Sequence, residues 1–459
     1  MFNPLRWEGK EITVIGAGVS GLGLAGFAAS LGARVFISAD RPAADTSLRE
    51  KLKALNIPWE EEHTQRAYEG EYMLLSSGIP PSSPAVKEGL RRGMTVMGEL
   101  DFLAPHLSGR ILGVTGSNGK STTTALLGHM LQKRGFSAAV AGNIGIPLSE
   151  AAGKPWDYIV AELSSFQLFW NTSLSCDLSI VTNLAPDHID WHGSYGDYVQ
   201  AKKRILTTRK TGGPAILQWR DREALKAETL TGGGIYYFHW MGEEGPSDLP
   251  SILADDGRKG VFLRQGREVD LLFSFSDLPL LGSHNIENAA MAAGALRLLG
   301  IGGDLGDLFE GFRGLEHRCE FVANKGGRIF INDSKGTNVA SSTTALNSIP
   351  GVKVVILGGK GKGEDYAPLA ETVKRVALAA VVLGAEGDRI TEALALTGFE
   401  RVVRADDMEE AVRMAAGIPG AEVVLLSPAC TSWDMYPSFK KRGEHFREIV
   451  SRLKEDDIV

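Results

Sequence analysis

The strongest chemical signal in the sequence is a glycine-rich stretch, GVTGSNGKS, at residues 113–121. It lies between an apolar run typical of a strand and a helical pattern over residues 121–134. Backbone amides of such a turn can hold phosphates, a lysine can neutralise them and a serine can bind Mg²⁺. The candidate ligands of a nucleoside triphosphate are Gly116, Asn118, Gly119, Lys120, Ser121 and Thr122. An ordinary turn with a solvated lysine is the alternative, because the usual GxxxxGK[ST] pattern requires glycine at Val114.

Acidic and histidine residues that could bind metal follow two further apolar runs. Glu162 ends one run, at the place where a phosphate-binding domain is expected to carry a second metal-binding acid. The segment NLAPDHIDWHG, residues 183–193, brings together two histidines and two aspartates, which favours binding of metal or substrate. The alternative for Glu162 is a glutamate in a surface turn. The alternative for residues 183–193 is a polar loop held by its own hydrogen bonds.

A second glycine-rich stretch, GAGVSG at residues 16–21, matches GxGxxG, and Asp40 follows where a ribose-reading acid could lie. Alone, this pattern would suggest NAD. The same glycines serve any tight turn between a strand and a helix. The stretch therefore indicates either binding of a nucleotide diphosphate or close packing.

The composition limits the class of protein. A length of 459 residues predicts roughly three domains at about 150 residues each. The net charge of −7 gives no overall attraction to nucleic acid or anionic membranes. Cys176, Cys319 and Cys430 lie far apart, which argues against disulfides and structural zinc. Because residues 1–10 lack a signal-peptide core and the apolar run 376–383 is too short to cross a bilayer, we expect a cytoplasmic protein without membrane insertion.

β-Branched runs, each followed by a glycine-containing turn and a helical pattern, recur along the chain and predict an α/β fold with parallel sheets. The pattern divides into blocks at residues 1–108, 109–314 and 315–459. Between residues 211 and 278 the pattern is weak and indicates mixed or antiparallel sheet. The predicted strands are 12–15, 34–37, 72–76, 110–114, 158–161, 178–181, 354–357, 380–383 and 423–426.

Together, these stretches closely resemble the Mur ligase family, whose central domains carry a TGxxGK[ST] loop, a strand ending in Glu and an Asn-x-x-x-Asp-His segment. The resemblance covers almost the whole chain. Further matching stretches are GNIGIP at 142–147, YVQAKK at 198–203, GSHNIEN at 282–288, EHR at 316–318, NDSKGTN at 332–338 and LGGKGK at 357–362. The resemblance implies a Rossmann-like N-terminal domain for a UDP substrate, a central P-loop ATPase-type domain and a Rossmann-like C-terminal domain that binds an amino acid and closes on ATP.

The substrate is indicated by LSPACTSWDMY at residues 426–436, with Phe439, Arg442 and Gly443, which resembles the branch of the family that adds D-glutamate. The stretch SGIP at 77–80 is similar to the UDP-binding domain of that branch. The implied activity is ATP-dependent ligation of D-glutamate to UDP-N-acetylmuramoyl-L-alanine through an acyl phosphate, a step of peptidoglycan synthesis. The implied protein uses Mg²⁺. We also expect a monomer that binds no nucleic acid.

The resemblance also implies tasks for particular residues. Lys120, Lys202 and His188 would be catalytic, and Mg²⁺ would be bound by Ser121, Glu162, His188 and a carbamylated Lys202. Beyond the glycine-rich loop, ATP would contact Asn285, Asn288, Arg318, Asp333 and Lys335. The UDP substrate would contact Gly18, Val19, Ser20, Ser38, Gly78, Asn143 and His188. D-Glutamate would contact Thr337, Lys362, Ser432 and Phe439.

Two positions leave questions open. Carbamylation of Lys202 needs a neutral amine, so burial or Mg²⁺ must lower a pKa that is about 10.4 in a free side chain. The neighbouring Lys203 is the alternative, but the two side chains point about 100° apart on a helix, so we predict that Lys203 is solvated. In the first block, the family resemblance implies an acid that reads uracil near the end of the second strand. The chain reads ISAD there, at residues 37–40, so the residues that contact the uridine stay open.

Two other classes of protein compete with a ligase. An NAD-dependent dehydrogenase would explain residues 16–21 but not the Lys120 loop or residues 332–338. A non-catalytic nucleotide-binding regulator would explain the Lys120 loop but not residues 427–436. An acyl-phosphate reaction needs no covalent protein nucleophile, which agrees with a sequence that carries no nucleophile motif.

Overall fold

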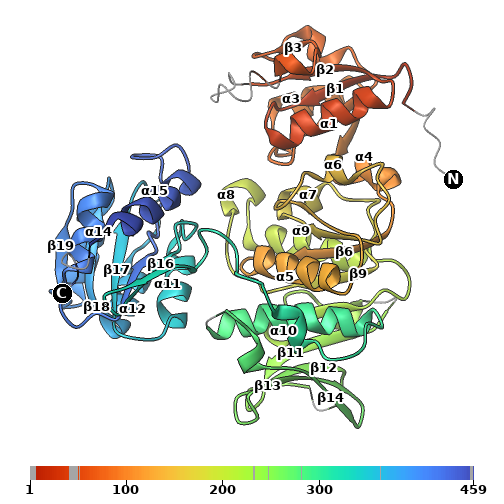
Figure 1. The fold of residues 1–459 in the computed structure, drawn as a ribbon. Helices are drawn as coiled ribbons and strands as arrows, with labels where there is room; N and C mark the ends of the chain where they lie inside the picture. Colours follow the sequence, from red (N-terminus) through yellow and green to blue (C-terminus); the bar gives the residue numbers. More distant parts are fainter. Residues whose placement is uncertain are drawn as a thin grey trace. The chain divides into compact units, whose positions relative to one another are not determined.

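The computed structural model describes residues 7–40, 50, 52–230, 233–246, 248–280, 282–361, 363–454 and 458. These residues form three β-sheets (Figure 1), in agreement with the expected α/β class. The first two sheets belong to one compact unit, Met1–Leu278 with Glu287–Glu310, and the third belongs to a second unit, Pro279–Ile286 with Gly311–Val459. The assignment of three domains to three tasks stays a prediction. Lys362, a predicted D-glutamate ligand, lies outside the described residues.

The first sheet is parallel throughout, in the order β3-β2-β1-β4-β5. Val14 packs in the core on the α1 side, whereas Ile15 packs against α3, so both faces are covered and the strands are apolar. Because the five strands are parallel, their carboxyl ends lie at the same edge of the sheet, where α1 begins. The elements are β1 (Glu11–Ile15), α1 (Val19–Ser30), β2 (Arg34–Ser38), β3 (Trp59–Glu60), β4 (Tyr72–Leu75), α3 (Pro84–Arg91) and β5 (Thr95–Gly98).

The second sheet has the order β14-β13-β12-β11-β10-β9-β6-β8-β7. Its strands are parallel from β12 to β7, and β13 pairs antiparallel with both β12 and β14. This arrangement confirms the mixed sheet predicted for residues 211–278. The strands are β6 (Arg110–Thr115), β7 (Ala138–Gly142), β8 (Tyr158–Glu162), β9 (Leu178–Val181), β10 (Ala215–Gln218), β11 (Ile235–Trp240), β12 (Ser251–Asp255), β13 (Gly260–Gln265) and β14 (Glu268–Ser274). The helices are α5 (Lys120–Lys133), α6 (Leu148–Ala151), α7 (Ser165–Phe169), α8 (Ile189–His192), α9 (Tyr195–Thr207) and α10 (Ser283–Leu298).

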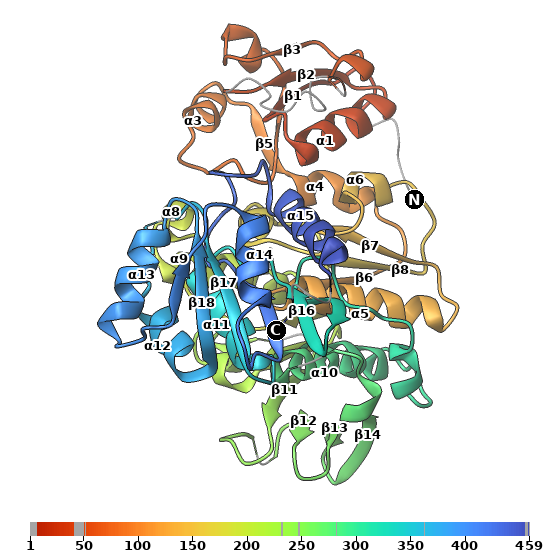
Figure 2. The same ribbon diagram turned by 60° about the vertical axis from the view of Figure 1, so that its left-hand side comes forward.

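The third sheet has the order β15-β16-β20-β17-β18-β19, and only its β15–β16 pair is antiparallel. Val354 and Ile356 of β17 pack against α14 and α15, whereas Val355 and Leu357 pack against α11, α12 and α13 on the other face. Figure 2 draws the strands and helices of this sheet in cyan to blue. The strands are β15 (Glu320–Lys325), β16 (Arg328–Asn332), β17 (Lys353–Gly358), β18 (Ala377–Leu383), β19 (Val402–Arg404) and β20 (Val423–Leu426). The helices are α11 (Val339–Ser348), α12 (Ala367–Val376), α13 (Gly387–Leu396), α14 (Met408–Ala416) and α15 (Phe439–Arg452).

The short helix α4 (Glu99–Leu103) joins the first two sheets. Its residues Leu100 and Phe102 are buried in a core that continues into the second sheet. The buried carboxylate of Glu99 accepts a hydrogen bond from Gln167 Nε2 at 2.9 Å. One continuous core therefore underlies both sheets. Within the described part of the chain, every helix is too short or too polar to cross a membrane.

Candidate active site

The glycine-rich turn between β6 and α5 is built around Gly119. Gly119 has φ 81°, and a Cβ atom there would lie 2.2 Å from Asn288 Oδ1, so only glycine fits. Lys120 follows at the first position of α5, and its Nζ donates to the carbonyl oxygens of Gly116 and Ser117, both at 2.9 Å. Lys120 thus lies along the loop and is half-buried, which argues against the alternative of a solvated lysine.

Ser117 ties this loop to the polar segment 183–193 and to α9. Its Oγ lies 2.9 Å from Ala185 O, 2.8 Å from Ala185 N and 2.8 Å from Tyr198 Oη. A hydroxyl group has one hydrogen to donate and two lone pairs, so Ser117 donates to Ala185 O and Tyr198 must donate to Ser117. Asn183 Oδ1 also accepts from Asn118 N at 2.9 Å. Residue spacing predicts no task for Ser117 or Tyr198, although Tyr198 lies in the stretch YVQAKK that matches the family.

Lys202 reaches the same loop from α9. Its side chain is only 2% exposed, and Nζ donates to Gly116 O at 2.6 Å. Burial and the charge of Lys120 hold the pKa of Lys202 well below its usual value, although Asp187 and Glu162 act in the opposite direction. The environment therefore favours a neutral amine beside the glycine-rich loop of residues 113–121, which is the predicted phosphate loop.

Lys203 points elsewhere, with its Nζ 3.5 Å from Thr229 Oγ1. The prediction that Lys203 is solvated is wrong, since the residue is only 9% exposed. The 3-10 turn Ala227–Thr229 lies beside its amine, a contact that joins segments 26 residues apart and leaves no local pattern. The predicted difference in direction is confirmed, because only Lys202 contacts the phosphate loop.

Glu162 is the last residue of β8 and is 1% exposed. Its Oε1 accepts from Asn143 Nδ2 at 3.0 Å, whereas Oε2 has no hydrogen-bond partner among the residues described. A buried carboxylate oxygen without a donor is costly, so this oxygen suits a bound cation. Together with the buried hydroxyl of Ser121, it offers the oxygen ligands that Mg²⁺ prefers.

The described residues contain no cluster of three His, Cys, Asp or Glu side chains arranged for a metal ion. Mg²⁺ does not require such a cluster, because it usually keeps several waters and binds one or two carboxylates together with substrate phosphates. The donor set is thus compatible with Mg²⁺ that arrives with a nucleotide.

The two histidines of segment 183–193 differ in environment. His188 is the N-cap residue of α8 and has φ 52°, an uncommon conformation for a residue other than glycine. It is half-exposed, and its ring lies 4.7 Å from the Phe166 ring. His192 lies 2.9 Å from Ser165 Oγ through Nε2. Burial and the charges of His188 and Lys202 lower the pKa of His192 to about 4. His192 is therefore neutral near pH 7, whereas His188 remains the predicted ligand of metal and of the UDP substrate.

The residues predicted for a UDP substrate lie on two sheets of the first unit. Gly18, Val19 and Ser20 form the start of α1, and Ser38 ends β2 at the same sheet edge. Gly21 is required for packing, because a Cβ atom there would lie 1.9 Å from Gly16 O. The other predicted UDP-substrate residues are associated with the second sheet. Asn143 comes directly after β7, and His188 directly precedes α8. The carbonyl oxygen of Gly78 accepts a hydrogen bond from Trp191 Nε1 at 3.0 Å.

In the second unit, the segment after β16 carries several predicted ATP ligands. Asp333 is buried and accepts from Ser427 Oγ at 2.7 Å, and burial raises the pKa of Asp333 to about 6. The ammonium of Lys335 lies 5.9 Å from the centre of the Phe439 ring. Arg318 stands between two residues with left-handed backbone, His317 (φ 63°) and Cys319 (φ 43°). Such strain is often concentrated at functional sites.

The asparagines predicted to contact ATP are both buried on α10, but they fall in different compact units. Asn285 belongs to the second unit and Asn288 to the first. Asn288 Oδ1 accepts from Thr123 Oγ1 at 3.3 Å, which brings it to the phosphate-loop helix. The sequence pattern does not predict this division of α10.

Arg442 of α15 organises the loops that carry the predicted D-glutamate residues. It is 1% exposed and donates to Ser334 O at 2.8 Å, Cys430 O at 3.0 Å and Thr431 O at 3.2 Å. The segments containing Thr337 and Ser432 are thereby joined. Ser432 is 2% exposed, and its Oγ has no hydrogen-bond partner within the described ranges. In the sequence, Arg442 stands only beside a stretch that matches the family, and residue spacing predicts no task for it.

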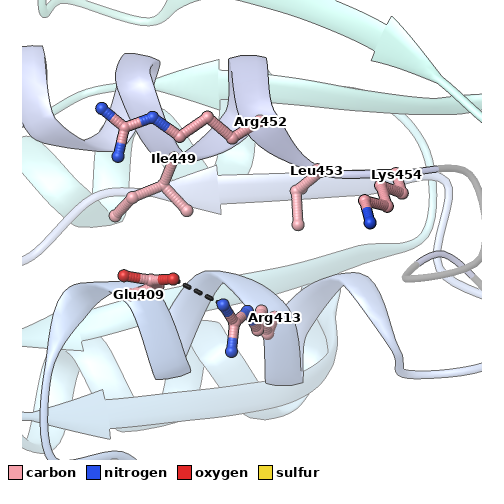
Figure 3. Close-up of a pocket in the computed structure, with 6 residues that line it drawn as sticks. All are labelled: Glu409, Arg413, Ile449, Arg452, Leu453 and Lys454. Carbon is pink, nitrogen blue, oxygen red and sulfur yellow. Dashed lines mark hydrogen bonds and ion pairs between the residues drawn. The ribbon is translucent and has the colours of Figure 1, made fainter.

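A separate hollow lies between α14 and α15 (Figure 3). Its volume is about 210 Å³, and Glu409 and Arg413 form an ion pair beside it. None of the predicted site residues lines this hollow. Its lining residues are Glu409, Arg413, Ile449, Arg452, Leu453 and Lys454.

Comparison with known proteins gives full-length matches. Residues 114–296 match the Mur ligase middle domain, and residues 317–430 match the Mur ligase glutamate ligase domain. The UDP-N-acetylmuramoylalanine–D-glutamate ligases of Desulfitobacterium hafniense (strain Y51) and Chromobacterium violaceum are each 37% identical to the chain, over 98% of it and 99% of each relative. The crystal structure of a UDP-N-acetylmuramate–alanine ligase from Thermotoga maritima has a similar fold, with a TM-score of 0.62 at 18% identity, over 97% of this chain and all of that one. A MurF ligase of the same organism, in complex with ADP, has a TM-score of 0.58 at 18% identity, over 99% and 98%.

Proposed function

Because the chain belongs to the Mur ligase family, we propose that it joins D-glutamate to UDP-N-acetylmuramoyl-L-alanine in a reaction driven by ATP. The observation that carries this proposal is the 37% identity to ligases with that printed name, over 98% of the chain. The phosphate loop with Lys120, the buried Glu162 and the buried Lys202 supports the use of ATP. Neither a dehydrogenase nor a regulator accounts for this arrangement.

We propose that the three sheets divide the substrates among them. The first, Rossmann-like part (residues 1–108) would bind the UDP moiety, the second part (109–314) ATP on a P-loop-type turn, and the third (315–459) D-glutamate. The carboxyl ends of parallel strands support this division, since they carry the predicted residues of all three parts. Asn143 and His188 would extend the UDP-substrate site into the second part.

The proposed reaction has two steps. A carboxylate oxygen of the alanyl group attacks the γ-phosphorus of ATP, the bond to ADP breaks, and an acyl phosphate forms. The amine nitrogen of D-glutamate then attacks the acyl carbon, phosphate leaves, and the amine loses a proton. Phosphoryl transfer depends mainly on positioning and on stabilisation of charge, which are the tasks of Lys120, Arg318 and Lys335. Mg²⁺, held by Ser121 and Glu162 with His188 and the modified Lys202, would neutralise phosphate charge.

An assay of phosphate release tests the proposed function. We expect the purified protein to release phosphate from ATP only when UDP-N-acetylmuramoyl-L-alanine and D-glutamate are both present. L-Glutamate in place of D-glutamate is the matched control and should give no release above background. Release without either substrate would support a plain ATPase, and oxidation of NADH would support the dehydrogenase. Either result would reject the ligase.

Ser432 is expected to help select the amino acid. Its hydroxyl is buried without a described partner, so it can donate to a carboxylate of D-glutamate. A hydrogen bond to a charged group contributes roughly 1.5–3 kcal/mol, and 1.4 kcal/mol corresponds to about tenfold in affinity. Ser432→Ala should therefore raise the KM for D-glutamate at least about tenfold and leave the KM for ATP within about twofold. Ser451→Ala, on the exposed part of α15, is the control; equal changes in both constants for Ser432→Ala would indicate a structural role.

A further inference from the structure

The carboxyl end of β2 lies beside that of β3 and carries a cluster of polar side chains. The two strands pair in parallel register, with Ser38 opposite Glu60. Ser38 is completely buried, Glu60 is half-buried and His63 follows shortly after β3. The cluster is at the sheet edge where α1 begins. No other part of the proposed reaction uses Glu60 or His63.

The hydrogen bonds in this cluster fix the carboxylate of Glu60. Ser38 Oγ donates to Glu60 Oε1 at 2.6 Å, and His63 Nδ1 lies 2.7 Å from Ser38 Oγ. The hydroxyl has a single hydrogen, so His63 must carry its proton on Nδ1 and donate to Ser38. Thr64 donates to Glu60 Oε1 through its backbone N at 3.1 Å and to Oε2 through Oγ1 at 2.6 Å.

The Glu60 carboxylate still has room for a ligand. A carboxylate offers about four acceptor positions, two on each oxygen. In the part of the chain that the structure describes, Oε1 accepts two hydrogen bonds and Oε2 accepts one, from Thr64. Although burial opposes ionisation, the hydrogen bonds from Ser38 and Thr64 hold the pKa of Glu60 below its ordinary value. Glu60 is therefore an oriented anion with an acceptor position left.

The topology explains why a carboxylate is useful at this place. In nucleotide-binding sheets of this type, an acid near the end of the second strand accepts a hydrogen bond from the nucleoside ribose. Here β2 ends in Ser38, and Asp40, two residues later, is exposed. The register of β2 and β3 places Glu60 at the level of Ser38. The neighbouring strand thus supplies the carboxylate that β2 lacks.

We propose that Glu60 reads the nucleoside of the UDP substrate, by accepting a hydrogen bond from a ribose hydroxyl or from the N3–H of uracil. Ser38 and His63 are positioning residues that orient the carboxylate. This inference rests on the proposed function and deepens it, because it names the chain's own nucleoside-reading group. It also assigns Ser38 a different task from the direct UDP contact that the family resemblance implies.

The test is binding of UDP to the full-length protein by isothermal titration calorimetry, together with steady-state kinetics. Glu60→Gln keeps the size of the side chain but removes the charge; it should raise the Kd for UDP at least about tenfold and the KM for the UDP substrate similarly. The KM values for ATP and D-glutamate should stay within about twofold. Glu62→Gln, at an exposed position on the same loop, is the matched control and should bind UDP like the wild type.

Analogues of UDP identify the donor and protect the test against misfolding. Wild-type protein should bind either 2′-deoxy-UDP or 3-methyl-UDP at least about tenfold more weakly than UDP, and Glu60→Gln should lose that preference. Equal binding of UDP and both analogues by the wild type would overturn the inference, as would an unchanged Kd for UDP in Glu60→Gln. The proposed ligase function would be rejected by a different result, namely a wild-type protein that neither binds UDP nor ligates D-glutamate.

Discussion

Lys120→Ala is expected to reduce turnover by roughly a thousandfold or more, the scale seen when a positioned charge-stabilising group is removed. Lys120 Nζ lies within the turn that is proposed to hold the phosphates of ATP, 2.9 Å from two of its carbonyl oxygens. The loss of these hydrogen bonds should cost about 1 kcal/mol, because water replaces them. Phosphate release under saturating substrates measures the effect on turnover, and thermal unfolding should shift by only about 2–4 °C.

Lys133→Ala provides the matched control for this experiment. Lys133 ends the same helix, α5, where it forms an exposed ion pair with Glu310 at 2.8 Å. Exposed pairs of this kind contribute about 0–1 kcal/mol, so this variant should ligate like the wild type. If Lys120→Ala retained more than about a tenth of wild-type turnover, the loop would have no part in phosphoryl transfer.

Lys202→Ala should be nearly inactive, and a short carboxylic acid such as acetate should restore part of the activity. We expect the neutral amine of Lys202 to attack the carbon of CO₂ and release one proton, which leaves a carbamate anion beside the phosphate loop. The deep burial of the amine and its position near Lys120 and Glu162 support this modification. Acetate can restore activity only if it binds in the space left by the Lys202 side chain and replaces the carbamate anion there. Turnover with and without added acetate is the measurement.

The neighbouring lysine makes a stringent control. Lys203→Ala removes a side chain of equal size from the same turn of α9, yet its amine lies by Thr229 and not by the phosphate loop. This variant should keep wild-type turnover and show no response to acetate. A crystal of the active, metal-loaded protein with a bare ammonium on Lys202 would contradict the carbamate, and so would greater damage from Lys203→Ala.

Much of the fold could be predicted because buried parallel strands leave a strong local signal. The apolar runs at residues 178–181 and 423–426 coincide with β9 and β20, and β18 only begins three residues earlier than predicted. In β17, Val354 and Val355 face opposite cores, so the whole run had to be apolar. The antiparallel hairpin of β13 and β14 could be predicted only as mixed sheet. Its exposed residues, including Val269 and Leu271, weaken the pattern.

The site could be predicted only where its chemistry is local in the sequence. The loop with Lys120 and the strand-ending Glu162 both stand in short motifs. The bond between Ser117 and Tyr198 joins positions 81 residues apart, and the pairing of Ser38 with Glu60 depends on the order of strands in the sheet. The covered position of Lys203 likewise depends on a turn 26 residues away. Contacts of this kind arise from topology, which residue spacing alone does not encode.

The core shared by the first two sheets limits how this protein can be dissected or recombined. Leu100 and Phe102 of α4 are buried together with residues of the second sheet, and Glu99 is bonded to Gln167 in α7. A fragment cut after residue 108 would expose these apolar side chains and leave a buried carboxylate without its donor. Chimeras that exchange the first sheet between relatives must therefore carry the matching residues of α6 and α7 as well, because α6 packs against α1 and α7 is bonded to α4.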